Sequence, residues 1–343
     1  LKMKKNISVA VLGSTGYTGL ELINILSKHP KISINFLGSN SNSGSSIKKF
    51  DNRINANKLP KLDNVKNLVF SKFDVVFLCL PNQISQKIVK KNFNLTNFID
   101  LSADFRINDP IIYKKNYGIK HSCPNLLNKF IYGLAEINYH KISKSNNIAV
   151  PGCYPTSILL PLIPLIKKKL IKTKNIIIDS KSGYSGAGKD FNLKNLFNND
   201  TYNFYNYKTN DHRHICEIHQ ELKKFNKSSI KFSFNPHVLP IFRGLMSTIY
   251  CDLSKNVSIK DINDCLDNFY SNSKFVKIIK KEQRMDFFKV QHNNNCFIKL
   301  HNHYDSSKII ITSLIDNLLK GASGQAVQCM NIMFGYNENL GIK

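Results

Sequence analysis

The stretch VAVLGSTGYTG at residues 9–19 decides how the chain begins to fold. Its first residues complete an apolar strand, Ile7 to Leu12, and an apolar helix from Tyr17 to Ser27 follows. A glycine turn between a strand and a helix lets backbone N–H groups approach a pyrophosphate at the positive helix N-terminus. The pattern therefore predicts a dinucleotide site, with a tight turn that holds no ligand as the alternative. The candidate residues are Gly13, Ser14, Thr15, Gly16, Tyr17, Thr18 and Gly19.

Strand and helix signals continue to alternate up to about residue 150. The apolar run DVVFLCL at 74–80 is typical of a strand that is buried on both faces of a parallel sheet. We also expect strands at 32–37 and 98–101 and a helix at 83–91. This alternation predicts a doubly wound parallel sheet, the Rossmann architecture of α/β proteins.

The pattern changes at about Pro151, where strand signals begin to outnumber helix signals. This change favours a second, α+β domain built on a mixed or antiparallel sheet. A helix should follow Cys153, and Pro161 and Pro164 should bend or shorten it. The other elements that we expect are strands at 175–181, 230–234, 245–253, 297–301 and 309–314, and helices at 259–270 and 324–334.

The end of the second strand discriminates between nicotinamide cofactors. An NAD enzyme usually carries an acidic residue there, which binds the ribose hydroxyls. This chain has FLGSNS at 36–41, without a carboxylate, and Lys48-Lys49 downstream. Hydroxyls and lysines suit a 2′-phosphate, so we expect NADP as the cofactor, with Ser39 and Ser41 among its ligands.

The composition limits the classes of function. The 343 residues leave room for two domains, and 42% hydrophobic residues is ordinary for a globular protein. No apolar run is long enough to span a bilayer, and the first residues lack the pattern of a signal peptide. Eight cysteines without paired spacing indicate thiols in a reducing compartment. We therefore expect a cytoplasmic protein that does not bind a membrane.

The 49 basic and 23 acidic residues give a formal charge of +26, which raises the alternative of a nucleic-acid-binding protein. The lysines are spread along the whole chain and lack the interleaved arginine and aromatic residues of an RNA-binding patch. We attribute the charge to compositional drift and expect no nucleic-acid partner. A positive potential also suits an enzyme that binds an anionic small molecule.

The segment PGCYPT at 151–156 places Cys153 at the start of a helix. Pro155 fits the first helical turn, where its missing N–H costs nothing. A thiol at this position experiences the helix dipole and free N–H groups, which favour the reactive thiolate. Cys153 is therefore the candidate nucleophile, with a small core residue as the alternative.

A histidine-rich cluster, DHRHICEIH, occupies residues 211–219. We expect no metal there, because HEXXH spacing is absent and no second Cys/His group lies close in sequence. A general acid/base histidine is the favoured interpretation. His212 and His214 are two positions apart, so we expect them to point to different sides, with at most one facing Cys153. We favour His214 over His212 as the catalytic group.

Nine motifs, in order along the chain, carry a specific resemblance. They are GSTGYTG (13–19), LPNQIS (80–85), DLSADFR (100–106), YGLAEIN (132–138), PGCYPTS (151–157), SGYSGAGK (182–189), HRHICEI (212–218), NPHVLPIFRGLMSTIY (235–250) and DNLLKGASGQAVQCMN (316–331). Together they resemble the N-acetyl-γ-glutamyl-phosphate reductase family over nearly the whole chain. The resemblance implies an NADP-binding Rossmann domain at 1–150, completed by 315–343, whose C-terminal helix returns to it. It also implies a catalytic and dimerisation domain at 151–314 and a homodimer or homotetramer.

The resemblance further implies a reaction. It is the NADPH-dependent reduction of N-acetyl-L-glutamyl 5-phosphate to N-acetyl-L-glutamate 5-semialdehyde and phosphate, in arginine biosynthesis, through a thioester on Cys153. Aspartyl phosphate and N-acyl-aminoadipyl phosphate are the alternative substrates. The residues implied to hold the substrate are Arg106, Ser185, Lys189 and Arg243. Those implied to join the cofactor site are Pro81, Ser182, Gly183 and Asn317.

Some positions depart from the pattern of this family. Asn40 stands where an arginine is common, which weakens the expected hold on a 2′-phosphate. Lys189 replaces a usual arginine, and Cys216 replaces a usual proline after the histidines. For Arg106, a surface ion pair with Asp104 is the alternative to substrate binding.

Overall fold

The computed structural model describes residues 6–226, 228–280 and 282–343, and it divides into two compact units. The first unit contains the chain up to Gly152 together with Ala322–Lys343, and the second contains Cys153–Gly321. The chain returns to the first unit at Ala322, later than the expected residue 315. Asn317 still belongs to the second unit, where its side chain accepts from the backbone N–H of Gly244 (2.8 Å). In the described parts of the chain, no helix has the length and hydrophobicity needed to cross a membrane.

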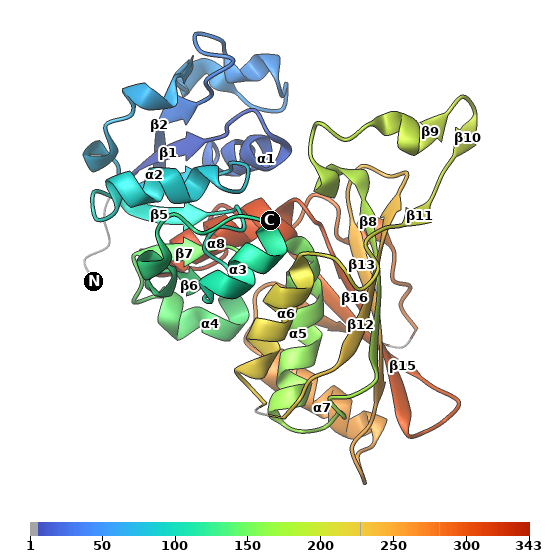
Figure 1. Cartoon of the computed structure of the whole chain (residues 1–343). Helices are drawn as coiled ribbons and strands as arrows, with labels where there is room; N and C mark the ends of the chain where they lie inside the picture. The colour runs from blue at the N-terminus through green and yellow to red at the C-terminus, as the bar shows by residue number, and fades with distance from the viewer. Residues whose placement is uncertain (1–5, 227, 281) are drawn as a thin grey trace. The chain divides into compact units, whose positions relative to one another are not determined.

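The first unit is built on a seven-stranded sheet whose paired strands are parallel, drawn in blue to green in Figure 1. The strand order is β3-β2-β1-β4-β5-β7-β6. The order reverses beside β1, so the carboxyl ends of β1 and β4 lie next to each other at the switch point. The bounds are β1 (Ile7–Leu12), β2 (Ile32–Gly38), β3 (Leu62–Asp63), β4 (Val75–Leu78), β5 (Asn97–Asp100), β6 (Ile131–Tyr132) and β7 (Asn147–Ala149).

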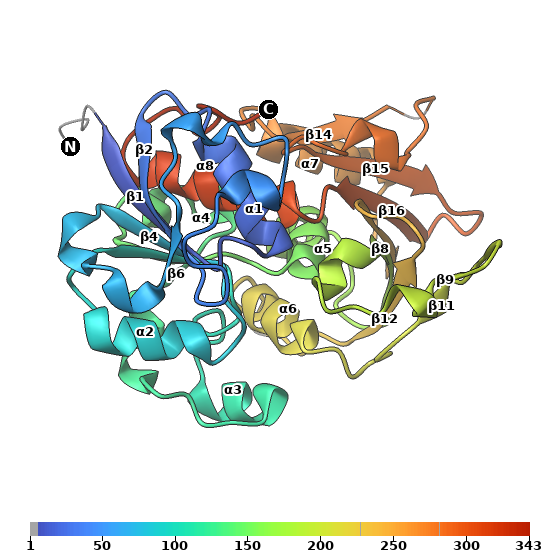
Figure 2. The same cartoon turned by 90° about the horizontal axis from the view of Figure 1, so that it is seen from above.

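Helices cover both faces of this sheet, as Figure 2 shows. On one face α1, α4 and α8 pack together, with Leu22, Ile142 and Met330 in one apolar cluster. On the other face Val89 of α2 packs in a second cluster with Phe98. The bounds are α1 (Tyr17–Leu26), α2 (Ile84–Asn92), α3 (Pro110–Tyr117), α4 (Ala135–Ile142) and α8 (Gly324–Met333). The predicted doubly wound parallel sheet and the return of the C-terminal helix to the first domain are confirmed.

The second unit is built on a mixed sheet with the order β11-β12-β8-β13-β16-β15-β14. The helices α5, α6 and α7 lie on one face of it (Figure 1). The opposite face presents Ile177 and Tyr250, which are 50% and 38% exposed. The predicted α+β second domain is confirmed. The bounds are α5 (Cys153–Lys167), β8 (Ile176–Gly183), β9 (Phe197–Asn198), β10 (Thr201–Tyr202), β11 (Tyr205–Asn206), α6 (His214–Lys223), β12 (Phe232–Leu239), β13 (Leu245–Asp252), α7 (Ile259–Tyr270), β14 (Val276–Ile279), β15 (Cys296–Asn302) and β16 (Lys308–Ile315).

We expected Pro161 and Pro164 to bend or shorten α5, and they do not shorten it. Pro161 and Pro164 lie inside a helix that is continuous from Cys153 to Lys167. Pro164 has no N–H to donate to the carbonyl of Leu160, and the hydroxyl of Tyr270 donates to that carbonyl instead (2.6 Å). Packing of α7 against α5 thus replaces a hydrogen bond that the helix itself cannot make.

The predicted strand at 230–234 also differs from the structure, where β12 continues to Leu239. Pro236 lies inside this strand, although proline cannot donate to a strand ladder. On the outer side, β11 pairs only with His237 and Val238, and the carbonyl of Pro236 accepts from the N–H of Tyr207 (3.0 Å). The short neighbouring strand therefore tolerates the proline.

Candidate active site

The glycine turn of the first unit is packed so closely that two of its glycines cannot carry a side chain. Gly13 has φ +79°, and a Cβ there would lie 2.1 Å from the carbonyl oxygen of Cys79. A Cβ on Gly19 would lie 2.3 Å from the carbonyl oxygen of Gly13. At Gly16, by contrast, the nearest atom is 3.6 Å away. The turn therefore brings bare backbone to the start of α1, at the switch point between β1 and β4.

The residues around this turn fit a dinucleotide. The first turn of α1 follows Gly16, which has no side chain to cap the helix N–H groups, and these suit a phosphate. Ser14 contributes backbone only, since its buried hydroxyl donates to the carbonyl of Val11 (2.8 Å). Strand β2 ends at Gly38 and is followed by Ser39, not by a carboxylate. Asn40 is engaged nearby, where its Oδ1 accepts from the N–H of Val65 (3.0 Å).

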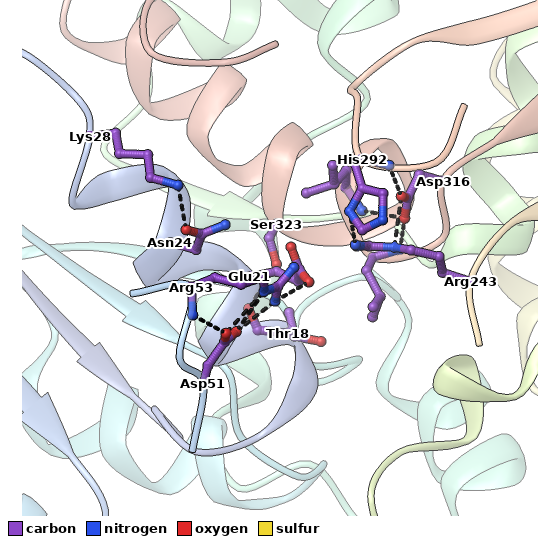
Figure 3. A network of polar contacts seen from close by, with 12 residues as sticks. Thr18, Glu21, Asn24, Lys28, Asp51, Arg53, Arg243, His292, Asp316 and Ser323 are labelled. Carbon is purple, nitrogen blue, oxygen red and sulfur yellow. Dashed lines mark hydrogen bonds and ion pairs between the residues drawn. The ribbon is translucent and has the colours of Figure 1, made fainter. Parts of the chain in front are cut away.

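A second network in the first unit anchors the loop after β2 (Figure 3). Arg53 pairs with Glu21 of α1 (2.7 Å) and with Asp51 (2.6 Å), and these carboxylates raise the pKa of its guanidinium. The hydroxyl of Ser323 donates to the carbonyl of Thr18 (2.8 Å), which ties the C-terminal segment to the start of α1. These contacts hold α1, which follows the glycine turn, to the loop after β2 and to the C-terminal segment.

The second unit contains a cavity of about 370 Å³ around Cys153. Its charged side chains are the cations Lys208 and Arg213, so the cavity suits an anionic ligand. Cys153 is partly exposed and is the first residue of α5, where the positive end of the helix dipole favours a thiolate. The residues that line the cavity are Cys153, Tyr154, Ser182, Gly183, Gly186, Ala187, Phe191, Tyr205, Tyr207, Lys208, His212, Arg213, His214, His237 and Val238.

Both histidines of the HRH motif line this cavity, so the expectation that they point to different sides is wrong. The ring centroids of His212 and His214 are 4.7 Å apart, and each ring meets the edge or face of Tyr154. His214 begins α6, whereas His212 lies in the turn before it. The Nδ1 of His212 accepts from the backbone N–H of His214 (3.1 Å). This bond to the helix start turns the His212 ring toward the cavity.

The environment of His212 keeps its ring neutral. Burial, with smaller contributions from the charges of Arg213 and Lys208, lowers the pKa of His212 to about 3. Because Nδ1 accepts a hydrogen bond, the ring proton lies on Nε2. His212 can therefore donate a hydrogen bond to a ligand at neutral pH.

Two tyrosines complete the inner wall of the cavity. The hydroxyls of Tyr154 and Tyr207 are 3.3 Å apart, and that of Tyr154 donates to the carbonyl of His237 (3.2 Å). Burial raises the pKa of Tyr207 to about 12 and that of Tyr154 well above its usual value. Both hydroxyls are therefore neutral donors at physiological pH.

Of the residues expected to hold substrate, Ser185, Lys189 and Arg243 do not line the cavity. Ser185 accepts from the side chain of Asn317 (2.9 Å), and Asn317 accepts from Gly244 (2.8 Å). Lys189 is exposed. Asn317 therefore links the segment of Ser185 to the segment of Gly244. Ser182 and Gly183, which were expected at the cofactor, line the cavity.

Arg106 and Pro81 belong to the first unit. Arg106 is 8% exposed, and its Nε and Nη2 donate to the carbonyls of Val150 (2.7 Å) and Leu101 (2.8 Å). Its alternative role in a surface ion pair is therefore wrong. Asp104 is fully buried and accepts from the hydroxyl of Tyr113 (2.6 Å). Pro81 follows β4 and is exposed.

Ten cavity residues were missed at the level of sequence, among them Tyr207, Lys208, Arg213 and His237. Arg213 stands between the two histidines, and that position was a usable signal. Tyr207, Lys208 and His237 lie on β12 or in the Asn/Tyr-rich segment before residue 211, where no regular pattern gives side-chain direction. Across the ranges that the structure describes, no group of three His, Cys, Asp or Glu side chains could hold a metal ion.

The fold and the cavity define a class, a nicotinamide-dependent dehydrogenase with separate cofactor and catalytic domains. Two family models match the chain: "Semialdehyde dehydrogenase, NAD binding domain" at residues 8–145 and "Semialdehyde dehydrogenase, dimerisation domain" at 153–317. The chain is 44% identical over 342 residues to the N-acetyl-gamma-glutamyl-phosphate reductase of Ehrlichia canis. The aligned region covers 99% of this chain and 98% of that protein. The chain therefore belongs to the N-acetyl-γ-glutamyl-phosphate reductase family of oxidoreductases.

Solved structures agree on the fold. The aspartate semialdehyde dehydrogenase II of Vibrio cholerae, complexed with ASA, has a TM-score of 0.73 at 17% identity, covering 96% of this chain and 98% of that one. The aspartate semialdehyde dehydrogenase of Candida albicans, solved with NADP, has a TM-score of 0.68 at 16% identity, covering 96% and 98%. At these identities the likeness concerns the fold alone.

Proposed function

We propose that this chain reduces N-acetyl-L-glutamyl 5-phosphate to N-acetyl-L-glutamate 5-semialdehyde and phosphate with NADPH, a step of arginine biosynthesis in the cytoplasm. The observation that carries the proposal is one cavity in which Cys153, at the start of α5, meets two histidines and two cations. An acyl-phosphate reductase needs a thiol nucleophile, a proton-transfer group and positive charge for the phosphate. Family membership at 44% identity supports the same substrate.

Cys153 and His214 perform the covalent step in this proposal. His214 accepts the thiol proton, the thiolate attacks the acyl carbon, and the bond from that carbon to the phosphate oxygen breaks, leaving a thioester. His214 then gives its proton to the departing phosphate. When bound, NADPH supplies the hydride that reduces the thioester carbonyl. Collapse of the resulting thiohemiacetal alkoxide breaks the carbon–sulfur bond and releases the semialdehyde and the Cys153 thiolate, which regains its proton from solvent.

The neighbouring side chains hold the substrate. His212 donates from Nε2 because its Nδ1 is bound to the backbone of α6. Lys208 and Arg213 offer positive charge to the phosphate or the α-carboxylate from the same wall. Arg106, Ser185 and Lys189 stay substrate-binding proposals from the family resemblance, and none of the three lines the cavity.

NADP is the proposed cofactor, bound at Gly13 to Gly19. Support comes from the crowded glycines and from the absence of a carboxylate where β2 meets Ser39. The hydroxyls of Ser39 and Ser41 suit a 2′-phosphate. By resemblance to the family, Pro81, Ser182, Gly183 and Asn317 are also proposed as cofactor ligands.

We further propose a homodimer, alone or within a tetramer, that forms through the face of the second sheet opposite α5. The matching family model is a dimerisation domain, and this face presents Ile177 and Tyr250 to solvent. Sedimentation velocity should show a dimer or tetramer that Ile177→Asp dissociates. A native monomer at micromolar concentration would contradict this assembly.

One assay tests the function. The purified protein should reduce NADP+ with N-acetylglutamate semialdehyde and inorganic phosphate, and far more slowly with aspartate semialdehyde or the longer N-acyl-aminoadipate semialdehyde. Activity that depends on phosphate distinguishes acyl-phosphate chemistry from simple aldehyde oxidation. A preference for either of the other aldehydes would reassign the substrate, and no activity with any of them would reject the class.

A further inference from the structure

The segment KGASGQA at 320–326 has no part in the proposed reaction, yet its Gly321 lies directly behind the nucleophile. A Cβ placed on Gly321 would lie 2.7 Å from the Cβ of Cys153 and 3.2 Å from its Cα. Carbon atoms do not pack at 2.7 Å, so a side chain at residue 321 would displace Cys153 or the turn. The backbone of Gly321 therefore packs directly against Cys153, the first residue of α5.

Asp316 fixes the turn that contains Gly321 through hydrogen bonds to both its backbone and its side chain. Its carbonyl accepts from the N–H groups of Leu319 (3.2 Å) and Gly321 (3.0 Å). Its Oδ1 accepts from the N–H groups of Leu318 (2.9 Å) and Leu319 (3.2 Å). Asp316 is fully buried, so these bonds form away from water and fix the turn from 316 to 321.

Arg243 in turn holds the carboxylate of Asp316 (Figure 3). Its Nε lies 2.9 Å from Oδ2, and the backbone N–H of His292 donates to the same oxygen (2.8 Å). The Nη1 of Arg243 donates to Nδ1 of His292 (2.7 Å), and Arg243 is 3% exposed. The guanidinium is thus directed at Asp316 and His292, which accounts for its absence from the lining of the Cys153 cavity.

We propose that Asp316 is a positioning residue for Cys153. In this proposal Arg243 orients the carboxylate of Asp316, Asp316 fixes the turn that contains Gly321, and the backbone of Gly321 packs against Cys153. The proposal rests on the proposed function in so far as Cys153 is the nucleophile. A nucleophile must be held within a fraction of an ångström of its reactive geometry, and displacement of about 1 Å can cost roughly a hundredfold in rate. The role assigned to Arg243 changes accordingly, from substrate binding to support.

Gly321→Ala tests the contact with the smallest change elsewhere. We expect kcat to fall about tenfold or more, with the Kd of NADPH within about twofold of native. Iodoacetamide should also alkylate Cys153 more slowly, as measured by peptide mapping. The matched control is Gly118→Ala after α3, where φ is +81° and the new Cβ meets nothing within 4 Å. That variant should lose stability and keep its kcat.

Two substitutions test the carboxylate. Asp316→Asn keeps an acceptor for Leu318 but removes the charge that faces Arg243, and Arg243→Lys keeps the charge but cannot reach both Asp316 and His292. Both should lower kcat and slow the alkylation of Cys153, with little change in KM. If Asp316→Asn does not fold, Arg243→Lys and Gly321→Ala decide the matter.

The outcomes separate this inference from the proposed function. An active Cys153→Ser variant would reject the nucleophile and, with it, the function. An inactive Cys153→Ser beside Gly321→Ala and Arg243→Lys variants of native kcat and native alkylation rate would reject only the positioning role of Asp316.

Discussion

The two sheets of this molecule build their sites in opposite ways. In the first sheet every residue of β4 is buried, because helices cover both faces, and the candidate cofactor site is a contiguous backbone turn at 13–19. In the second sheet β8 alternates buried and accessible residues, and the Cys153 cavity collects side chains from β8, β11, β12, α5 and α6. A backbone site depends on local conformation, whereas a side-chain site depends on segments that are far apart in sequence.

This difference has a consequence for substitutions. A change in the glycine turn acts through backbone crowding and should impair cofactor binding alone. A change in the cavity acts through the chemistry of one side chain and should impair turnover while cofactor binding persists. Turnover and NADPH affinity, measured side by side for each variant, test this separation.

Cys153→Ser should abolish turnover, by roughly 10³-fold or more, because a serine hydroxyl is not ionised at neutral pH. NADPH binding, followed by fluorescence titration, should stay native. Iodoacetamide should label Cys153 fastest among the eight cysteines, whereas burial raises the pKa of Cys216 to about 12. Retention of a tenth of the native turnover would end the covalent mechanism.

The two histidines should separate kinetically, although they share one cavity. His214→Asn should lower kcat by about 10²–10⁴-fold and flatten the acidic limb of the pH profile. His212→Asn keeps an acceptor for the α6 backbone but loses the Nε2 donor, so KM for the acyl phosphate should rise with little change in kcat. His212→Gln, which can replace the Nε2 donor, is the matched control, and its KM should lie between those of the native protein and His212→Asn. Interchanged phenotypes would swap the two roles.

Gly13→Ala should weaken NADPH binding by roughly ten- to a hundredfold, because its Cβ collides with the carbonyl of Cys79 and its φ is positive. Gly16→Ala is the control, since its new Cβ meets its nearest atom at 3.6 Å. Alkylation of Cys153 should proceed at the native rate in both variants. Equal NADPH affinity in the two variants would show that crowding does not shape this site.

Acid should destabilise the protein through its buried histidines. His212 has a pKa lowered to about 3 in the folded chain but titrates near 6.5 when unfolded. Between these values the unfolded chain binds more protons, so the free energy of unfolding falls as pH drops below about 6.5. One such group contributes at most about 1.4 kcal/mol per pH unit. Urea unfolding at pH 7, 6 and 5 should show a shallower decline for His212→Gln, and parallel curves would contradict this origin.

Asn40→Arg should give the smallest effect, a severalfold gain in NADPH affinity at low salt with NADH unchanged. The gain is limited because Asn40 gives up its bond to the N–H of Val65, worth about 1 kcal/mol. Titrations with both cofactors at two salt concentrations measure it. Equal affinity of the native protein for NADPH and NADH would contradict the choice of NADP.

Sequence patterns alone determined most of the architecture. Ile7–Leu12 and Ile259–Tyr270 form the strand and the helix that were expected, because local apolar periodicity reflects burial inside regular elements. The glycine turn was recognisable for the same reason, since its residues are contiguous. Cys153 followed from the proline signal at a helix start, and the ordered motifs pointed to the family.

Only the tertiary structure decided which side chains line the cavity and how they are oriented. His212 precedes α6, so periodicity could not give its direction, and a hydrogen bond from the backbone of His214 turns it toward the cavity. Arg243 was expected at the substrate, but the buried Asp316, distant in sequence, holds its guanidinium. The continuity of α5 through Pro164 depends on a hydroxyl from α7. In each case a hydrogen bond or an ion pair that apolar periodicity does not encode decides the direction of a group, and such contacts become known only when the chain is folded.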